Sequence, residues 1–422
     1  MSFIHYLEYK ETEVEWLKQI PKHWDTLKIR RICQIKKRIV GELGFEVLSI
    51  TQRGIKIKDT DSNDGQLSMD YSKYQLVEIG DFAMNHMDLL TGYVDISKYK
   101  GVTSPDYRVF SLKDTNLFCD RYILLLFQNG YLNKVFFPFG QGSSQLGRWR
   151  LPTEQFNDFR FPVPPINEQR KITHFLDDQL FKINILISEQ EKLIELLKEK
   201  RKAVISNAVT KGLNTKVKMK GSGAEWLGDI PEHWEIRKIK WLLKLKNEKT
   251  QERSNTIALE NIEGWTGRFI NTDSEFEGDG VKFNEGDILF GKLRPYLAKV
   301  FKATMSGEAI GDFFVLEPNQ NLLSEFAEKL LISSEFIDAI NSSTYGTKMP
   351  RVSWNYFSSM SIPLPPKIEQ LQISNYLENA IKVMDELIAK SNHAVALLQE
   401  RRTALISAAV TGEIDVGNYY GN

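Results

Sequence analysis

Apolar residues recur at heptad spacing along one long stretch of the chain, residues 167–210. Heptad positions a and d stay mostly apolar over successive repeats, which is typical of a helix that packs against another helix. Pro164 and Pro165 precede this pattern and Gly212 follows it, so the sequence predicts both ends of the helix. At about 1.5 Å rise per residue the helix is roughly 65 Å long. Its predicted seam contains Leu176, Leu180, Ile183, Ile187, Ile194 and Leu197.

The same seam recurs in residues 368–411, and even its polar interruptions correspond, with Gln190 matching Ser391 and Arg201 matching Arg402. We therefore expect the two helices to pair with each other, antiparallel, as an intramolecular coiled coil. The polar seam residues could set the register, although a buried Gln or Arg is also commonly a frayed or snorkelling position. The apolar seam residues of the second helix are Leu377, Ile381, Met384, Ile388, Val395 and Leu398.

Shorter motifs repeat in the same order as the helices. EWLKQIPKHW (15–24) returns as EWLGDIPEHW (225–234), and FPVPPINEQ (161–169) returns as IPLPPKIEQ (362–370). Two tryptophans around an Ile-Pro turn predict a docking clip, because tryptophan buries a large area. Each clip contains one histidine but no cluster of metal ligands, which favours a structural role for His23 and His233. The sequence therefore predicts two copies of the same order of parts: a clip, a variable domain and a long helix.

The segments between clip and helix align poorly with each other, and both have a mixed α/β pattern. In the first we expect strands at 45–51, 107–112 and 122–128, and in the second a helix near 322–341. Residues 211–224 are interpreted as a linker, and the tail after Gly412 as disordered.

The fold class expected is α/β (α+β), with two mixed domains joined by two long helices and an internal pseudo-two-fold duplication. The predicted boundaries are 1–161 for the first clip and domain, 162–212 for the first helix, 213–361 for the linker, second clip and second domain, 362–415 for the second helix, and 416–422 for the tail.

Composition narrows the class of protein. The 422 residues are 42% hydrophobic, which suffices for two to three packed domains. No apolar run approaches the ~20 residues of a membrane span, and the start has no signal-peptide character. Two cysteines, Cys33 and Cys119, give no disulfide framework, so we expect a cytoplasmic protein. The formal net charge is zero, which argues mildly against nucleic acid as a partner.

Catalytic motifs are not found in the sequence. Gly286 to Lys292 fits GxxxxGK, but Leu293 replaces the required Ser or Thr and Pro295 follows where a helix should begin. The glycines near 140–147 miss the GxGxxG spacing, and no methyltransferase Asn/Asp-Pro-Pro-aromatic motif occurs. A duplicated scaffold with two variable domains and no catalytic motif indicates a protein that binds and recognises other molecules rather than an enzyme.

Together with GDILFGKLRPYLAKV (286–300) and GTKMPRVSW (346–354), the repeated clips and helix starts resemble the specificity subunit of type I restriction-modification systems. The resemblance covers essentially the whole chain. It implies two target-recognition domains, each reading one half of an asymmetric bipartite site in double-stranded DNA, and paired helices that fix the spacer. It implies no cofactor in this chain. Two modification subunits would use S-adenosylmethionine, and two restriction subunits would use ATP and magnesium.

Candidate DNA contacts follow from the side chains that usually bind bases and phosphates. Each could instead be a solvated loop residue or a partner of a local carboxylate. In the first domain we expect contacts from Gln141, Ser143, Ser144, Gln145, Arg148 and Arg150, then from Asn85, His86, Ser104 and Tyr107. In the second domain we expect contacts from Lys292, Arg294, Tyr296, Lys348, Arg351 and Ser353.

Charge fits this interpretation unevenly, because the first domain has more basic than acidic residues and the second has slightly more acidic ones. Two other hypotheses stay open. The chain could be a scaffold or adaptor whose domains bind proteins, as long paired helices often do. A fused or solitary DNA methyltransferase is disfavoured by the missing cofactor motif.

Overall fold

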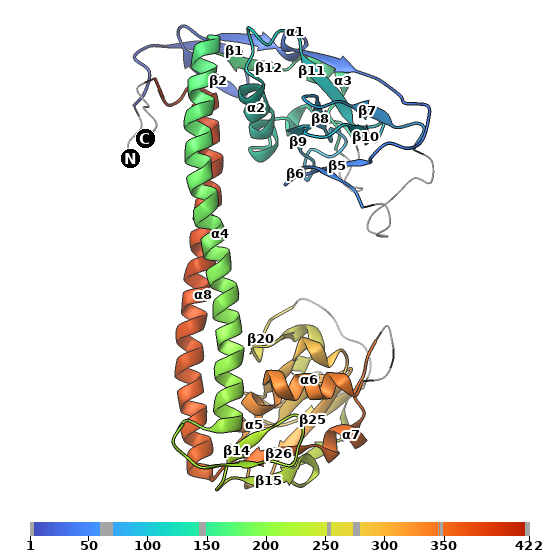
Figure 1. Ribbon diagram of the computed structural model, residues 1–422, viewed down its shortest axis with the longest axis vertical. Helices are drawn as coiled ribbons and strands as arrows, with labels where there is room; N and C mark the ends of the chain where they lie inside the picture. Colours follow the sequence, from blue (N-terminus) through green and yellow to red (C-terminus); the bar gives the residue numbers. More distant parts are fainter. Residues whose placement is uncertain are drawn as a thin grey trace. The chain divides into compact units, whose positions relative to one another are not determined.

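The computed structural model describes residues 4–59, 71–142, 149–250, 255–272, 279–344, 346 and 349–417. The chain divides into two compact units: Met1–Glu189 with Ala394–Asn422, and Gln190–His393. Each unit contains one variable domain, here called a head, and one end of each long helix, α4 (Ile166–Lys211) and α8 (Lys367–Val410) (Figure 1). Among the described residues, none of the helices has the length and apolar character needed to cross a membrane.

The first head is built on a four-stranded antiparallel sheet in the order β4-β11-β8-β9. Helix α2 packs on it, with Phe127 of the helix in contact with Phe82 and Phe110 of the sheet. Burial of large aromatic rings is the main stabilising contribution here. The elements are β4 (Cys33–Lys36), β8 (Phe82–Met84), β9 (Val94–Ile96), β11 (Arg108–Leu112), α1 (Ile29–Ile32), α2 (Asp120–Leu132) and α3 (Thr153–Asp158).

Short strand pairs complete the first unit. A small apolar cluster with Leu48, Ile50 and Val77 lies under two of them. The pairs are β1 (Tyr9–Val14) with β2 (Leu17–Pro21), β3 (Asp25–Lys28) with β12 (Arg160–Val163), β5 (Leu48–Thr51) with β6 (Gly54–Ile57), and β7 (Gln75–Val77) with β10 (Gly101–Thr103).

The second head repeats the core of the first. Its sheet has the order β16-β25-β22-β23, again antiparallel throughout. The elements are β16 (Leu243–Lys246), β22 (Ile288–Gly291), β23 (Val300–Lys302), β25 (Phe313–Pro318), α5 (Ser324–Leu331), α6 (Ser334–Ser342) and α7 (Trp354–Ser359). The flanking pairs β13 (Met219–Gly221) with β14 (Asp229–Pro231) and β15 (Glu235–Lys238) with β26 (Ser361–Leu364) match those of the first unit.

The second head also has a second sheet, β17 (Lys249–Thr250), β21 (Gly280–Phe283), β24 (Gly307–Ile310) and β18 (Thr256–Ile257), and the hairpin β19 (Ile262–Glu263) with β20 (Arg268–Phe269). In the first head the pair β7 with β10, and the isolated bridges Ile39–Gln75 and Val47–Val102, follow the same pairing order.

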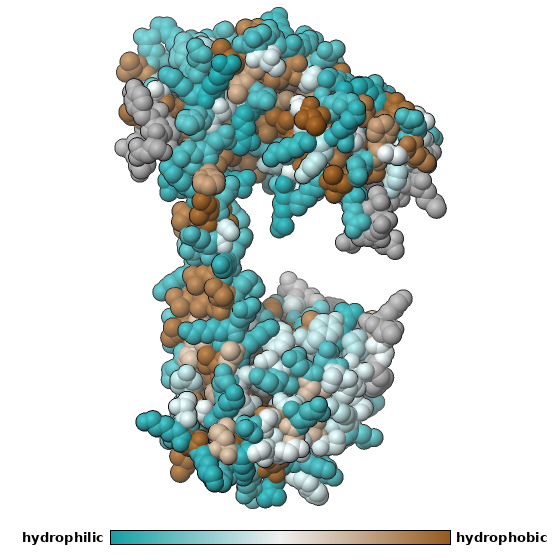
Figure 2. Space-filling view, in the orientation of Figure 1, coloured by the Kyte–Doolittle hydropathy of each residue, from teal (hydrophilic) through white to brown (hydrophobic). Residues whose placement is uncertain are grey.

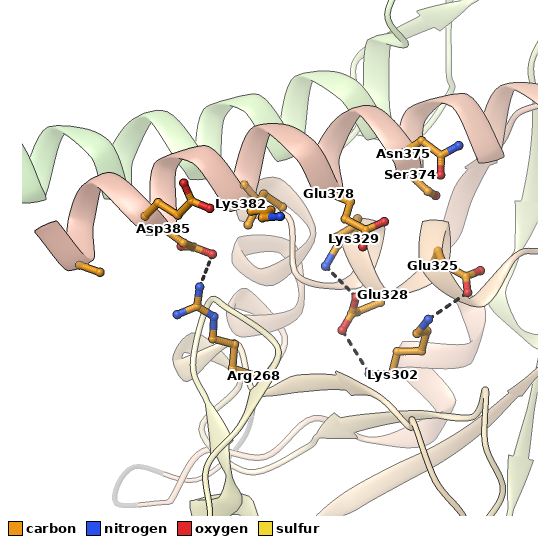
Figure 3. Close-up of a pocket in the computed structure, with 13 residues that line it drawn as sticks. Arg268, Lys302, Glu325, Glu328, Lys329, Ser374, Asn375, Glu378, Lys382 and Asp385 are labelled. Atoms are coloured by element: carbon orange, nitrogen blue, oxygen red, sulfur yellow. Dashed lines mark hydrogen bonds and ion pairs between the residues drawn. The ribbon is translucent and has the colours of Figure 1, made fainter.

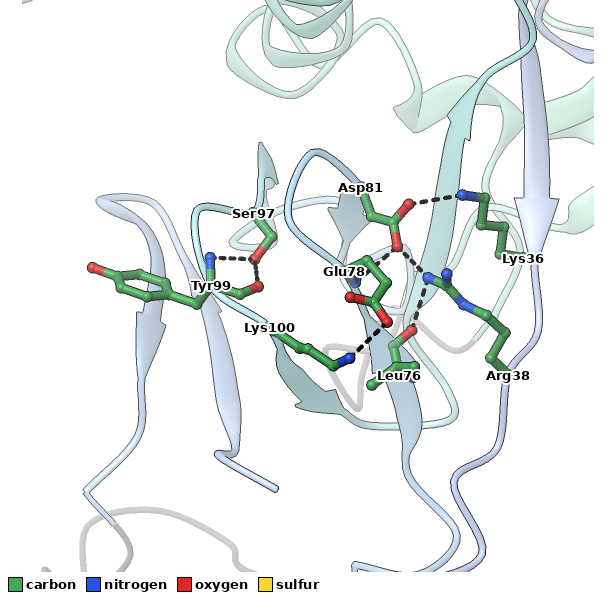
Figure 4. A network of polar contacts seen from close by, with 8 residues as sticks. All are labelled: Lys36, Arg38, Leu76, Glu78, Asp81, Ser97, Tyr99 and Lys100. Atoms are coloured by element: carbon green, nitrogen blue, oxygen red, sulfur yellow. Dashed lines mark hydrogen bonds and ion pairs between the residues drawn. The ribbon is translucent and has the colours of Figure 1, made fainter. Parts of the chain in front are cut away.

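A buried ion pair shows how closely the two cores correspond. Lys36 contacts Asp81 at 3.0 Å, and Lys246 contacts Asp287 at 2.7 Å. Each aspartate follows a glycine at positive φ, near +90° in both heads, where a Cβ would strain the turn. Figure 4 shows Asp81 held by Lys36 and Arg38. The two head sequences align poorly, but the core topology and this turn are the same in both heads.

The long helices pair antiparallel within each unit. In the first unit Leu176, Leu180 and Ile183 near the start of α4 share a core with Leu405 and Ile406 near the end of α8. In the second unit the end of α4 packs in the same way on the start of α8. The predicted seam is buried at Leu176, Leu180, Ile183, Ile194, Leu197, Leu377, Ile381 and Met384, and half-buried at Ile187, Ile388, Val395 and Leu398.

The repeated Glu-Gln at each helix start fastens the head to the helix. Gln169 is fully buried; its Oε1 accepts from Cys119 N at 2.8 Å, and its Nε2 donates to the carbonyls of Leu117 and Pro164 at 3.0 and 2.9 Å. Gln370 makes the same three bonds in the second unit, to Leu323, Asn321 and Pro365. These bonds satisfy buried backbone groups that would otherwise destabilise the fold.

The clip histidines contact the glutamate at each helix start. His23 Nε2 lies 2.8 Å from Glu168, and His233 Nε2 lies 2.8 Å from Glu369. The clip residues Trp24 and Trp234 are fully buried. The histidines therefore join each clip to the start of a helix.

Several local predictions are wrong. Residues 122–128 belong to helix α2, because a segment buried on nearly every side shows no helical periodicity. The helix expected near 322–341 is two helices that break at Ile332 and Ser333. Strand β13 lies inside the expected linker. Residues 413–417 are ordered against the chain start, where Asp415 N donates to Ile4 O at 2.7 Å.

Candidate DNA interface

In the first head, the turn that follows β8 lies against the segment that precedes α3. Leu151 N donates to His86 O at 2.9 Å, and Leu89 N donates to Trp149 O at 2.9 Å. Gln141 and Arg150 exchange two backbone hydrogen bonds at 2.8 and 3.0 Å. Residues far apart in sequence are thereby held on one edge of the head, and Asn85, His86, Gln141 and Arg150 are among them.

The second head builds the same edge. Val352 N donates to Lys292 O at 3.1 Å, and Arg294 N donates to Pro350 O at 2.7 Å. Leu293 and Arg351 form a β-bridge. Three of the predicted cations, Lys292, Arg294 and Arg351, are therefore brought together in one loop cluster.

The two edges correspond residue by residue at their centre. The bond from Leu151 to His86 in the first head matches the bond from Val352 to Lys292 in the second. Arg150 and Arg351 each precede these donors and each lies three residues before a matched helix, α3 or α7. We call the first set, Asn85–Asp88 with Gln141 and Arg150, the first loop edge. The second set, Lys292–Arg294 with Pro350 and Arg351, is the second loop edge.

Electrostatic interactions order the second loop edge. Arg351 Nη2 donates to Asp312 Oδ2 at 2.8 Å, and Lys292 Nζ lies 3.9 Å from Asp312 Oδ1. The Lys292 ammonium also lies 5.8 Å from the centre of the Phe314 ring, which is within range for a cation–π contact. Arg294 adopts a left-handed backbone with φ of +49°. A strained, charged turn of this kind is found more often at functional sites than elsewhere.

A buried arginine underlies the first loop edge. Arg108 is 4% exposed, and its Nη2 donates to Leu151 O and Thr153 Oγ1, each at 3.2 Å. Its guanidinium lies 4.3 Å from the centre of the Phe156 ring, and it forms no ion pair within the described residues. Burial lowers the pKa of Arg108 to about 10, so the group stays charged at neutral pH.

The charge of Arg108 affects its neighbour. Burial first, and then the charges of Arg108 and Arg150, lower the pKa of His86 to about 3. His86 is therefore neutral at physiological pH and can offer hydrogen bonds but no charge. Sequence reasoning missed Arg108 because it lies in an apolar strand, RVFSL, where alternation alone does not reveal a buried cation.

The remaining predicted contacts are placed differently. Ser353 caps helix α7 by accepting from Tyr356 N at 3.3 Å, so its hydroxyl is already engaged. Tyr296 is exposed on the short 3-10 helix η5 (Pro295–Leu297). Ser104 and Tyr107 lie in the turn before β11, where both carbonyls accept from the Gln75 amide. Ser143, Ser144, Gln145, Arg148 and Lys348 lie outside the described residues.

Tyr107 lies near the first loop edge. Burial, followed by the charges of Tyr74 and Asp88, raises the pKa of Tyr107, so its phenol keeps its proton at neutral pH. The hydroxyl can therefore donate as well as accept a hydrogen bond.

A charged cleft of about 610 Å³ lies between α8 and the second head, and none of the described residues that line it belongs to a loop edge. Figure 3 shows Arg268 directed at Asp385 of α8, and Lys302 directed at Glu325. Lys329 pairs with Glu328 at 2.7 Å. Its described cations are thus largely paired with carboxylates, which disfavours a phosphate-binding role. Elsewhere in the described chain, no group of three or more His, Cys, Asp or Glu is placed to hold a metal ion.

Comparison with known proteins gives a consistent result. The family described as type I restriction modification DNA specificity domain matches residues 21–198 and again residues 231–396, one match in each copy of the repeat. The EcoDI specificity subunit of a type I restriction enzyme from Escherichia coli is 23% identical over 382 residues, covering 83% of each chain. The putative MjaX specificity subunit from Methanocaldococcus jannaschii is 22% identical over 453 residues, covering 99% of each chain.

The fold has a solved counterpart. A chain from work on complex assembly and conformational transition of the type I R-M system has a TM-score of 0.66 at 12% identity, covering 93% of this chain and 98% of that one. At that identity the likeness concerns the fold alone. The duplicated family match carries the assignment: this chain belongs to the type I restriction-modification DNA specificity family, the family of the specificity subunits of type I restriction enzymes.

Proposed function

We propose that each head reads one half of an asymmetric, bipartite site in double-stranded DNA, and that the chain itself is not catalytic. The observation that carries this is the pair of loop edges: the same backbone arrangement occurs in both heads with different side chains on it. Equivalent positions with different donors and acceptors would select different bases. Two identical heads would instead be expected to read two identical half-sites, that is, a palindromic site.

The chemistry of the two edges supports two different half-sites. The first edge offers a neutral imidazole at His86, the amides of Asn85 and Gln141, and one cation at Arg150. The second offers three cations, Lys292, Arg294 and Arg351. Arg and Lys favour guanine, whereas Asn and Gln favour adenine. The second head therefore has a local basic edge even though acidic residues slightly outnumber basic ones within it.

The helices would determine the unspecified spacer between the half-sites. Each of them is a single α-helix that takes part in both units, with 46 residues in α4 and 44 in α8. At 1.5 Å per residue, α4 is roughly 70 Å long. Paired helices resist bending better than a loop does, so they would fix the number of base pairs between the two readings.

Exposed apolar side chains on the helices support protein partners. In the first unit Phe181 and Leu186 are exposed, and Figure 2 shows hydrophobic surface along the helices. In the second unit Leu196 and Val383 are exposed in the same manner. Apolar groups that recur on a helix outside its seam favour packing against further helices.

We infer that two modification subunits dock on these helices and that two restriction subunits join the assembly. S-adenosylmethionine, ATP and magnesium would then be bound by those partners rather than by this chain. The loop edges alone present few cations, so the isolated chain would bind DNA weakly, with a shallower salt dependence than the complex.

The scaffold or adaptor hypothesis predicts the same exposed helices but no effect on DNA modification. The test is adenine methylation of DNA by the purified modification subunit with and without this chain, using labelled S-adenosylmethionine. We expect methyl transfer to a defined site only when both proteins are present. Equal methylation without this chain would favour the adaptor hypothesis, and tight DNA binding by the chain alone would contradict the division of labour proposed here.

A further inference from the structure

The two equivalent arginines, Arg150 and Arg351, have different surroundings. The side chain of Arg351 is 46% exposed and is fixed on one side by Asp312. Arg150 is also exposed, but among the described residues it forms no ion pair. In the first head the residue next to it across the edge is the neutral His86, whereas in the second head it is Lys292.

The contact with Asp312 leaves Arg351 free to bind. Only Nη2 donates to the carboxylate, and no partner for Nη1 or Nε occurs among the described residues. The backbone on both sides of Arg351 is also held, through the β-bridge to Leu293 and the bond from Val352 N to Lys292 O. The side chain therefore starts from a restricted set of conformations and loses less entropy when it binds.

A guanidinium presents parallel N–H donors that match the O6 and N7 acceptors of guanine. The guanidinium is planar on its own, and the hydrogen bond to Asp312 restricts the direction in which that plane and its free donors point, which sharpens the choice of base. Lys292, at 3.9 Å from the other Asp312 oxygen, limits the loss of positive charge that the carboxylate would otherwise cause.

Resting on the proposed function, we infer that Arg351 reads one guanine in the half-site of the second head. Asp312 acts as its positioning residue. Arg150 occupies the same place in the first head without such a carboxylate and therefore discriminates less between bases. The opposing interpretation is that Arg351 and Asp312 form an ordinary surface ion pair, which contributes little to either stability or recognition.

The test is single-molecule mapping of methylated adenines in DNA from cells that express the modification subunit with the wild-type chain or a variant. The variants are Arg351→Ala, Arg351→Lys, Asp312→Asn and Arg150→Ala. Arg237→Ala is the matched control, because Arg237 forms an exposed pair with Glu235 at 2.9 Å in the same head but outside the loop edge. Circular dichroism and co-purification with the modification subunit verify that each variant folds.

We expect the wild-type motif to contain a guanine in one half. In Arg351→Ala the preference at that position alone should fall by roughly 5- to 150-fold, the range for one bidentate contact. Arg351→Lys should lose most of it, because an ammonium lacks the fork, and Asp312→Asn should lose a smaller part at the same position. Arg150→Ala should change only the other half, and by less, and Arg237→Ala should change nothing.

Three results would overturn the inference: no change at any position in Arg351→Ala, a uniform decrease over all sites, which indicates a phosphate contact, or a change in the half-site that responds to Arg150→Ala. These are distinct from failure of the proposed function, in which the wild-type chain itself directs no bipartite motif.

Discussion

Replacing Asp385 of α8 with alanine should destabilise the second unit. Asp385 forms an ion pair with Arg268 (Figure 3). It also lies 3.7 Å from Arg201 Nε, and its side chain is only 14% exposed. Arg201 is a polar residue of the seam, 7% exposed, and donates to the carbonyls of Trp265 and Thr266 at 2.5 and 3.3 Å. The aspartate is thus the only carboxylate within ion-pair distance of Arg201 among the described residues.

The magnitude follows from burial. Removing one partner of a buried pair costs about 3–5 kcal/mol, because the other charge stays buried without compensation. Arg201 keeps its two carbonyl acceptors, and the exposed Arg268 contributes little, so we expect about 3 kcal/mol. Burial lowers the pKa of Arg201 and Asp385 opposes that effect, which agrees in sign with a carboxylate that stabilises the charged form.

Hydrogen exchange measured by mass spectrometry reports on this region separately, which matters because a chain of two units need not unfold in one step. In Asp385→Ala, amides of residues 262–269 and of the facing part of α4 should exchange faster by roughly 150-fold, the equivalent of about 3 kcal/mol. The double variant Arg201→Met with Asp385→Leu should recover most of the protection, since apolar replacement of a buried pair is often neutral.

The duplication provides the control. Asn184 lies as many residues after the start of α4 as Asp385 lies after the start of α8, and Arg402 corresponds to Arg201. Asn184 is exposed, so Asn184→Ala should change protection by no more than about 0.5 kcal/mol. An equally small effect of Asp385→Ala, or a double variant less stable than Asp385→Ala, would refute the reasoning.

Three further results are expected. Gln169→Leu should lower the free energy of unfolding of the first unit by about 3 kcal/mol, because it removes three buried hydrogen bonds, and Gln370→Leu should do the same for the second. Hydrogen exchange measured by mass spectrometry would report each unit separately, and a loss below about 1 kcal/mol would contradict the prediction. Cys33 is buried, and burial raises the pKa of its thiol. A maleimide at pH 8 should therefore label only Cys119 until denaturant is added. Rapid labelling of both Cys33 and Cys119 in the folded protein would be inconsistent with the fold. The pKa of His86 is lowered to about 3, so below about pH 6.5 the unfolded chain binds a proton at His86 that the folded chain does not. The wild type should therefore lose more stability than His86→Asn when the pH falls from 7 to 4. Parallel stability profiles of the two proteins over this pH range would argue against a buried neutral imidazole.

Sequence was informative where the physical signal is long or repeated. The helices α4 and α8 were predictable because a seam such as Leu176, Leu180 and Ile183 recurs at fixed spacing over many turns. The clips were predictable because tryptophans return at identical spacing. The role of the Glu-Gln pair at each helix start was not, because nothing in the sequence indicates which loop carbonyls a buried Gln169 will contact.

The heads were harder for three physical reasons. Their core strands have only three to six residues, too few for a clear period. Helix α2 is buried on nearly all sides, so its sequence is continuously apolar and resembles that of a buried strand. The loop edges are assembled by backbone hydrogen bonds between segments distant in sequence, such as His86 with Leu151, and backbone groups carry no sequence signature. For that reason Lys292 and Arg351 could each be proposed, but their proximity through Asp312 could not.

The most direct test of the account is the methylation motif that the wild-type chain directs when it is expressed with its modification subunit in a host without other adenine methylation. Single-molecule sequencing would give the motif at base resolution. We expect one asymmetric motif in two parts, separated by a fixed number of unspecified base pairs, and its complete absence when this chain is omitted. A palindromic or uninterrupted motif, a variable gap, or methylation that persists without the chain would contradict the proposal that two different heads on paired helices read the DNA.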